Sequence, residues 1–212
     1  LPYHHPLILA DRFMQLHHMT QGRAMFGAGP GALVSDAKMM GIETDRQRDM
    51  MEEALEDILK LFRGETVTHE TDWYTLKNAR LQLRPYGNQP IDVVTASMMS
   101  PSGPNAAGRL GTGLLSMSAS AAPALKVAGT NWDLACEVAA EHGNTMDRSQ
   151  WRMIGLVHVA ETREQAIADV QFGIEDWVRY FEDVAVIPMI PPERRGDPVA
   201  HLMDSGHAAI GT

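Results

Sequence analysis

The feature that most limits the possible folds of this chain is a regular alternation of short apolar segments with longer segments of helical periodicity. Short, continuous apolar segments bounded by turn residues are typical of strands buried on both faces. When a helix follows each strand, the units join as right-handed βαβ crossovers. The sequence therefore predicts an α/β fold with a parallel sheet, and both a closed barrel and an open doubly wound sheet fit this alternation. We place its strands at residues 24–29, 91–96, 114–117 and 153–159.

Apolar residues that recur every three or four positions mark the predicted helices. Thr44 with Gln47, and Thr162 with Gln165, match the capping box that opens a helix. The helices are expected near residues 6–22, 44–62, 104–110, 132–141 and 162–181, with a two-stranded excursion at residues 67–83 and a proline-rich loop at residues 187–198.

Charge and cysteine content exclude several classes of partner. The net charge of −9 comes from 27 acidic against 18 basic residues, without a run of Lys or Arg. This balance argues against nucleic acid and membrane partners. The single cysteine, Cys136, suits a reducing compartment, so we expect a cytoplasmic protein. The chain opens on Leu1 rather than Met, and we expect residues 1–212 to be one partial domain, truncated at both ends.

Two turns that follow predicted strands could bind a ligand. Residues 27–31 (GAGPG) could form a dinucleotide-binding turn, but Pro30 interrupts the spacing, and a simple tight turn is favoured. Residues 97–104 (SMMSPSGP) combine three hydroxyls with a glycine before a helix, which suits a phosphate. Capping of that helix by Ser100 or Ser102 explains the same residues equally well, so both interpretations stay open.

Other reactive residues give weaker signals. The nine histidines include two adjacent pairs without the helical spacing of metal ligands, so no metal site is predicted. His158 could face a barrel interior as an acid or base, although a hydrogen-bonded core histidine is the commoner case. Cys136 lies among apolar helix residues and is expected to be an inert thiol. Because GxSxG, Walker A and HExxH motifs are absent, the chemistry is expected to come from a bound cofactor.

The order of several segments resembles the bacterial luciferase-like flavin-dependent monooxygenases, and among them the limonene monooxygenase type. These segments are residues 1–6 (LPYHHP), 16–23 (LHHMTQGR), 26–31 (FGAGPG), 83–85 (LRP), 93–97 (VVTAS) and 211–212 (GT), with Asp36 and residues 41–42 between them. The resemblance spans essentially the whole chain. It implies a (β/α)8 TIM-type barrel of which this chain supplies the central part, about strands four to seven, with the active site at the carboxyl ends of the strands.

In that family reduced FMN and O2 supply the oxygenating chemistry, which the protein shields and positions. The resemblance thus implies a monooxygenase acting on an apolar small molecule, such as the terpene limonene or a long-chain aldehyde, with a separate flavin reductase and a homodimeric assembly. It favours the phosphate interpretation of the serine-rich turn. The implied cofactor-binding residues are Gly29, Ala96, Ser97, Ser100, Ser102 and Gly103.

Some family features do not carry over. The family's catalytic histidine follows an earlier strand that this chain lacks, so the catalytic residue is unknown. Bacterial luciferase has cysteine and arginine where this chain has Gly29 and Pro30, and relatives usually have Asp in place of His17. A deazaflavin-dependent dehydrogenase on the same barrel and a non-catalytic luciferase-like subunit remain as alternatives.

Overall fold

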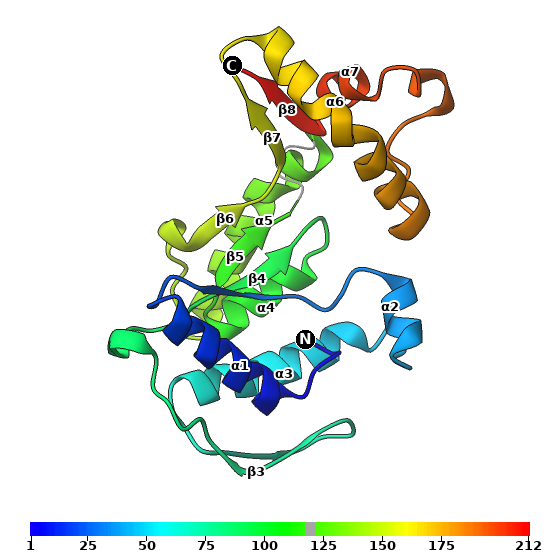
Figure 1. Cartoon of the computed structure of the whole chain (residues 1–212). Coiled ribbons are helices and arrows are strands. Elements are labelled where there is room, and N and C mark those ends of the chain that lie inside the picture. The colour runs from blue at the N-terminus through cyan, green and yellow to red at the C-terminus, as the bar shows by residue number, and fades with distance from the viewer. Residues whose placement is uncertain (118–121) are drawn as a thin grey trace.

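A four-stranded parallel sheet forms the centre of the molecule (Figure 1). The computed structural model describes residues 1–117 and 122–212. Within them the strand order is β1-β4-β5-β6, which confirms the predicted parallel βαβ arrangement. The strands are β1 (Met25–Ala28), β4 (Asp92–Ser97), β5 (Gly113–Ser116) and β6 (Trp151–Met153).

A second, smaller parallel sheet pairs β7 (Leu156–Val159) with β8 (Ala208–Gly211). The single strand predicted at residues 153–159 was therefore wrong, since it is divided between the two sheets. Ile154 closes the first ladder by donating its backbone N–H to the carbonyl of Ser116, and Gly155 separates it from β7. No strand was predicted for the last residues, yet β8 lies there. Figure 1 shows this second sheet with its helices set apart from the larger body.

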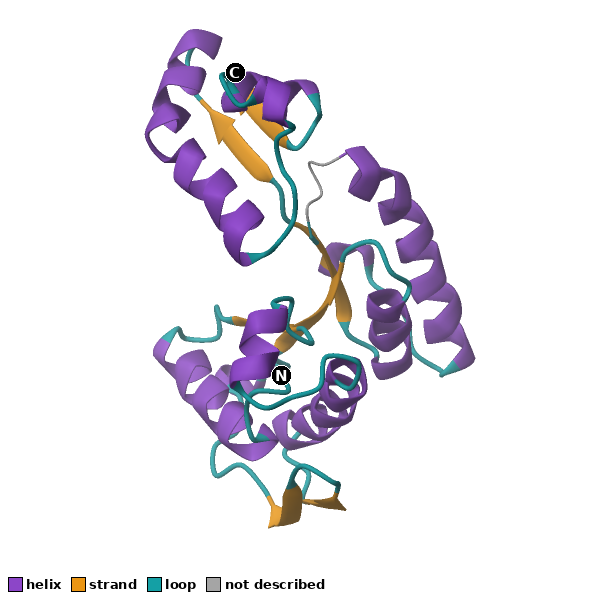
Figure 2. Cartoon of the chain, turned by 90° about the vertical axis from the view of Figure 1, so that its right-hand side faces the viewer, coloured by secondary structure: helices purple, strands orange, loops and turns teal. Residues whose placement is uncertain are grey.

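Helices cover the sheets on their outer side, as Figure 2 shows for α4 and α5. Their bounds are α1 (Pro6–Met19), α2 (Val34–Met39), α3 (Gln47–Phe62), α4 (Ser102–Leu110), α5 (Ala122–Glu141), α6 (Arg163–Arg179) and α7 (Pro198–Asp204). A π-helical turn, Tyr180–Val184, extends α6, and short 3-10 turns lie at Tyr86–Asn88, Arg148–Gln150 and Pro192–Arg194. The predicted loop at residues 187–198 is thus interrupted by one such turn, and α5 begins ten residues earlier than predicted.

The two predicted capping boxes had different outcomes. Thr162 accepts a hydrogen bond from the backbone N–H of Gln165 at 3.1 Å, so that helix start is confirmed. At α3 the prediction was wrong, because the helix begins at Gln47 and Thr44 does not cap it. The buried amide of Gln47 instead donates to the hydroxyl of Tyr3 (2.7 Å) and to the carbonyl of Pro30 (3.0 Å). It ties the loop after β1 to α3.

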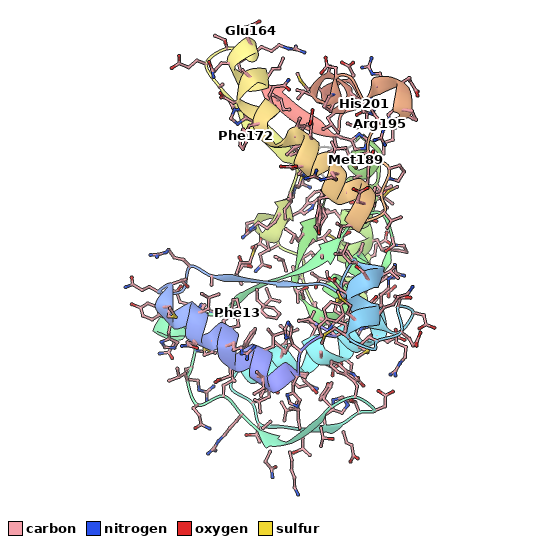
Figure 3. The ribbon with its side chains drawn as sticks, turned by 45° about the vertical axis from the view of Figure 1, so that its right-hand side comes forward. Phe13, Glu164, Phe172, Met189, Arg195 and His201 are labelled. Atoms are coloured by element: carbon pink, nitrogen blue, oxygen red, sulfur yellow. The ribbon has the colours of Figure 1, made fainter. Side chains whose placement is uncertain are left out.

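Within the described part of the chain, three groups of buried apolar side chains hold these elements together. The largest joins α1, α3, β1 and the hairpin, and in it Phe13, labelled in Figure 3, packs edge-on against Phe26 with ring centroids 4.9 Å apart. A second group joins α6, α7, β7 and β8. The third packs α5 against β5 and β6 through Leu114 and Trp132.

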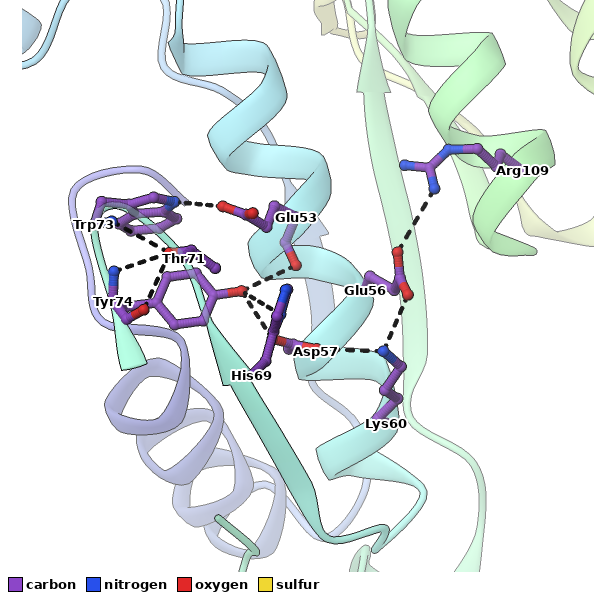
Figure 4. Close-up of polar contacts among 9 residues, drawn as sticks. All are labelled: Glu53, Glu56, Asp57, Lys60, His69, Thr71, Trp73, Tyr74 and Arg109. Carbon is purple, nitrogen blue, oxygen red and sulfur yellow. Dashed lines mark hydrogen bonds and ion pairs between the residues drawn. The ribbon is translucent and has the colours of Figure 1, made fainter. Parts of the chain in front are cut away.

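The predicted hairpin is confirmed as β2 (Val67–Glu70) and β3 (Thr75–Ala79), and a buried polar cluster attaches it to α3 (Figure 4). The carboxylate of Asp57, 1% exposed, accepts hydrogen bonds from the hydroxyl of Tyr74 (2.8 Å) and from Nδ1 of His69 (2.7 Å). Trp73 Nε1 donates to Glu53 at 2.7 Å. Burial, and then the neighbouring Asp57 carboxylate, raise the pKa of Tyr74 far above its usual range. Tyr74 therefore stays a hydrogen-bond donor at any ordinary pH.

Candidate functional site

The carboxyl ends of four strands meet along one edge of the central sheet. In the parallel register Ala28 lies beside Thr95, and Ser97 lies beside Ser116. The residues that follow β1 and β4 are therefore neighbours. A methyl group placed on Gly29 would lie 3.6 Å from Cβ of Ala96, so the structure brings these two predicted site residues together. Both are small, which leaves this part of the edge without bulky side chains.

Ser97 faces the helices rather than the inner side of the sheet. It is buried, and its hydroxyl accepts a hydrogen bond from Nδ2 of Asn131 on α5 at 3.2 Å. The same Nδ2 donates to the carbonyl of Met98, also at 3.2 Å. Asn131 was not predicted as a site residue. It fixes the start of the serine-rich loop, so the side chain of Ser97 acts as an anchor.

The rest of that loop leads into the first turn of α4. The hydroxyls of Ser100 and Ser102 lie 2.8 Å apart. Neither caps the helix, because the N-cap residue is Pro101 and no side chain bonds to the helix start, which removes the capping interpretation. The first backbone N–H groups of a helix have no partner within the helix, and those of Ser102 and Gly103 hold this position in α4.

Gly103 allows α4 to start directly against the end of β4. A methyl group there would lie 2.4 Å from the carbonyl oxygen of Ala96 and 2.9 Å from Cα of Ser97. Contacts that short do not occur between real side chains and backbone, so only glycine permits this approach. The helix N-terminus is thereby held next to Gly29 and Ala96.

An apolar row continues beyond the strand ends. Met117 donates its backbone N–H to the carbonyl of Ser97 (2.7 Å), and Ile154 donates to that of Ser116 (2.9 Å), so Met98, Met117 and Ile154 lie side by side. These three residues are 53%, 41% and 48% exposed. Methionine adapts its shape easily to apolar partners. This row offers a contact surface for an apolar molecule.

The inner side of the sheet also carries a charged pair. Arg152 is in register with Leu115, and its Nη2 lies 3.0 Å from Oδ2 of Asp92 at the other end of β4. The two charges offset each other. Neither residue was singled out from the sequence, because 60 positions separate them and no local pattern connects them.

The remaining sequence candidates add no catalytic group to this edge. His158 bonds to Asp169 of α6 at 3.0 Å on the partly exposed side of β7, away from the site. Burial raises the pKa of the Cys136 thiol, as expected for an inert cysteine. The glycine turn after β1 is a tight turn, since Gly31 has φ +95° and a methyl group there would lie 2.4 Å from the hydroxyl oxygen of Tyr3.

The structure also answers two questions about site classes. Among residues 1–117 and 122–212, no group of three or more His, Cys, Asp or Glu side chains is placed to hold a metal ion. In the same part of the chain, no helix has the length and apolar character needed to cross a membrane.

The profile of the luciferase-like monooxygenases matches residues 1–210. The chain therefore belongs to this family, which is known for TIM-type barrels, and the parallel sheet described above is part of such a barrel.

Two characterised relatives match over the whole chain. Limonene 1,2-monooxygenase of Rhodococcus erythropolis is 43% identical over 100% of this chain and 54% of the relative. The 4-hydroxyprotoasukamycin monooxygenase of Streptomyces nodosus subsp. asukaensis is 40% identical over 100% of this chain and 58% of the relative. The chain thus spans a little over half the length of these relatives.

Solved structures agree on the fold. The monooxygenase RslO1 from Streptomyces bottropensis superposes with a TM-score of 0.80 (22% identity, 100% of this chain, 60% of that chain). The oxygenating constituent of 3,6-diketocamphane monooxygenase from Pseudomonas putida is a type II Baeyer–Villiger monooxygenase whose structure is in complex with FMN. It superposes with a TM-score of 0.71 at 26% identity, over 100% of this chain and 63% of that chain. An F420-dependent secondary alcohol dehydrogenase superposes with a TM-score of 0.67 at 22% identity, over 99% of this chain and 62% of that chain.

Proposed function

We propose that this chain forms the cofactor-binding part of an FMN-dependent monooxygenase, which uses reduced FMN and O2 to oxygenate an apolar small molecule. The observation that supports this most directly is the edge where Gly29, Ala96 and the N-terminus of α4 come together. A terpene such as limonene is the first substrate to test, because one relative is named for it; a long-chain aldehyde is the second.

Each predicted cofactor residue has a distinct part in this proposal. The backbone N–H groups of Ser102 and Gly103, with the hydroxyls of Ser100 and Ser102, would hold the phosphate, because a helix N-terminus attracts an anion. Gly29 and Ala96 would leave room for the flavin ring. Ser97 would act through its bond to Asn131, which holds the loop in place.

Reduced FMN supplies the electrons that activate O2. The part of the protein is to hold the cofactor, exclude water and orient the substrate. The exposed row at the strand ends, Met98, Met117 and Ile154, suits an apolar substrate because it contains no charged side chain. We also propose a separate reductase as the source of reduced FMN, a homodimer as the assembly, and one partial barrel domain over residues 1–212. The catalytic residue stays unassigned.

A deazaflavin-dependent dehydrogenase is the second candidate, favoured by the structural similarity to an F420-dependent alcohol dehydrogenase. The two functions differ in their use of oxygen. A monooxygenase transfers one atom of O2 to its product, whereas a dehydrogenase transfers hydride and does not need O2.

The test uses the longest native form of the protein, with FMN and F420 titrated separately and reduced FMN then mixed with O2. A transient absorbance that differs from oxidised FMN, together with ¹⁸O from ¹⁸O2 in the limonene product, is expected. Gly29→Phe should weaken FMN binding at least about tenfold by filling the space beside Ala96, while Gly196→Phe, which has open space around it, should not. Binding of F420 but not FMN would replace this function with the dehydrogenase.

A further inference from the structure

We propose that the chain has a second small-molecule site, at the amino end of β4, which binds an amphipathic carboxylate. A cavity of about 450 Å³ lies between the end of α3, the loop over residues 84–90 and the start of β4. Ile91 and Val93 line it, whereas the proposed flavin site follows Ser97 at the other end of the same strand. The two sites are therefore separate, and this proposal does not depend on the monooxygenase activity.

The floor of the cavity is apolar. It is formed by side chains from the helix, the loop and the strand, of which Phe62 and Val93 are almost fully buried. These residues are Leu59, Phe62, Pro85, Pro90, Ile91 and Val93. A concave site of a few hundred Å³ with an apolar floor and a few polar groups is typical of small-molecule binding.

The rim is polar and locally positive. It carries two guanidinium groups and two amides, from Arg63, Arg84, Asn88 and Gln89, and no acidic residue lines the cavity. Nε of Arg63 is already paired with the carboxylate of Glu65 at 2.6 Å, so Arg84 supplies the charge that a ligand can use. This is the opposite sign to the whole chain, whose net charge is −9. A single anionic group is therefore the charge that this rim would favour.

The position of Arg84 is fixed from two sides. Its Nη1 donates to the carbonyl of Arg63 at 2.9 Å, at the end of α3, which uses only one of the five N–H donors of the guanidinium. Its own carbonyl accepts a hydrogen bond from His18 at 2.8 Å. A methyl group on Gly64 would lie 1.7 Å from Nη1 of Arg84, so the glycine makes room for this side chain.

The loop that forms the outer wall is also held in place. The buried ring of His17 accepts a hydrogen bond at Nδ1 from the backbone N–H of Tyr86 (3.2 Å), and Asn88 bonds back to the carbonyl of Pro85 (2.9 Å). Gly87 and Asn88 adopt positive φ angles of 65° and 55°, which make the turn tight. A wall ordered before binding reduces the entropy that a ligand must overcome.

These features together define the ligand class. The guanidinium group of Arg84 matches the planar, bidentate shape of a carboxylate, and the floor matches an apolar body of several carbon atoms. A free phosphate would not use the apolar floor, and a neutral alcohol would not use the rim.

The experiment is a calorimetric titration of octanoate into the purified protein, with octanol as the neutral comparison. Octanoate should saturate one site and bind more tightly than octanol. Arg84→Met should weaken octanoate binding about tenfold or more and leave octanol binding unchanged, since it removes a charge-assisted bond. Arg80→Met, which changes an exposed arginine outside the cavity, is the matched control and should have no effect.

Replacing Arg84 also removes its hydrogen bond to the end of α3. A second variant therefore tests the site while leaving that bond in place. Gln89→Trp places a large ring at the exposed rim and should block both ligands while the circular dichroism spectrum stays that of the unchanged protein. The proposal is overturned if octanoate does not saturate, if octanol binds as tightly as octanoate, or if Gln89→Trp binds octanoate with unchanged affinity.

Discussion

Replacing Tyr74 with Phe removes one hydroxyl from the cluster that attaches the β2–β3 hairpin to α3. That hydroxyl donates to the carboxylate of Asp57, a nearly fully buried acceptor, at 2.8 Å. The aromatic packing stays, so the variant measures the hydrogen bond itself. Because the pKa of Tyr74 is raised, the bond is present throughout neutral and mildly alkaline pH, and the effect should be the same at pH 6 and pH 9.

The size of the expected destabilisation depends on the contacts that Asp57 retains in the variant. Hydrogen bonds to charged groups contribute about 1.5–3 kcal/mol to the free energy of unfolding. The carboxylate still accepts from His69 at 2.7 Å and lies 3.4 Å from Nζ of Lys60 after the change. We therefore expect the free energy of unfolding to fall by about 2 kcal/mol, near the middle of that range. In a domain of this size such a loss lowers the melting temperature by about 4–8 °C.

The assay is urea denaturation followed by circular dichroism, with Tyr180→Phe as the matched control. Tyr180 is 48% exposed on the π-helical turn, so its loss of a hydroxyl should change the free energy of unfolding by less than about 0.5 kcal/mol. An equally small change for Tyr74→Phe would refute the reasoning, because the buried carboxylate would then not depend on this donor.

Three further predictions address the site and its surroundings. Gly103→Ala should destabilise the protein by about 1–3 kcal/mol in urea denaturation, because its methyl group would meet the backbone of β4, whereas Gly129→Ala, in open space on α5, should be neutral or slightly stabilising; equal effects would contradict this. Burial, and then the charge of the neighbouring His18, lower the pKa of His17. Because the unfolded chain then binds this proton more readily than the folded protein, the free energy of unfolding should fall as the pH drops below about 6.5. His17→Asn should reduce that fall, and a variant with the unchanged pH profile would argue against it. Met117→Lys should raise KM for an apolar substrate about tenfold or more, while Met39→Lys, at a position outside the strand edge, should leave KM unchanged.

His17 shows what the structure adds to a family comparison. The family resemblance leads us to expect Asp at this position in relatives, and it gives no reason for the histidine. In the structure Nδ1 of His17 accepts the backbone N–H of Tyr86, a role that a carboxylate can also fill. Protonation of the imidazole would remove this acceptor, so the contact between His17 and the loop depends on pH.

The strands and the glycine turns could be predicted because the signals are local. The β-branched segment at residues 91–96 gives a strand at 92–97, and the position of Gly29 and Ala96 follows from where two neighbouring strands end. The break between β6 and β7 could not be predicted, since it depends on which partner each half pairs with. Likewise, Thr44 has the composition of a cap, but the contacts of Gln47 with a distant loop decide where α3 begins.

The alternation of side chains along β4 separates the roles of neighbouring site residues. Val93, Thr95 and Ser97 point toward the helices, where Thr95 bonds to Thr112 at 2.7 Å and Ser97 bonds to Asn131. Ala96 points the other way, in register with Leu115 of β5. Since side chains in a strand alternate between faces, a ligand at the inner side of the sheet meets Ala96 and not the hydroxyl of Ser97. The serines that can reach a phosphate are those after the strand has ended, where the backbone turns into α4, so the chemistry of this edge depends on the helix start more than on the strand.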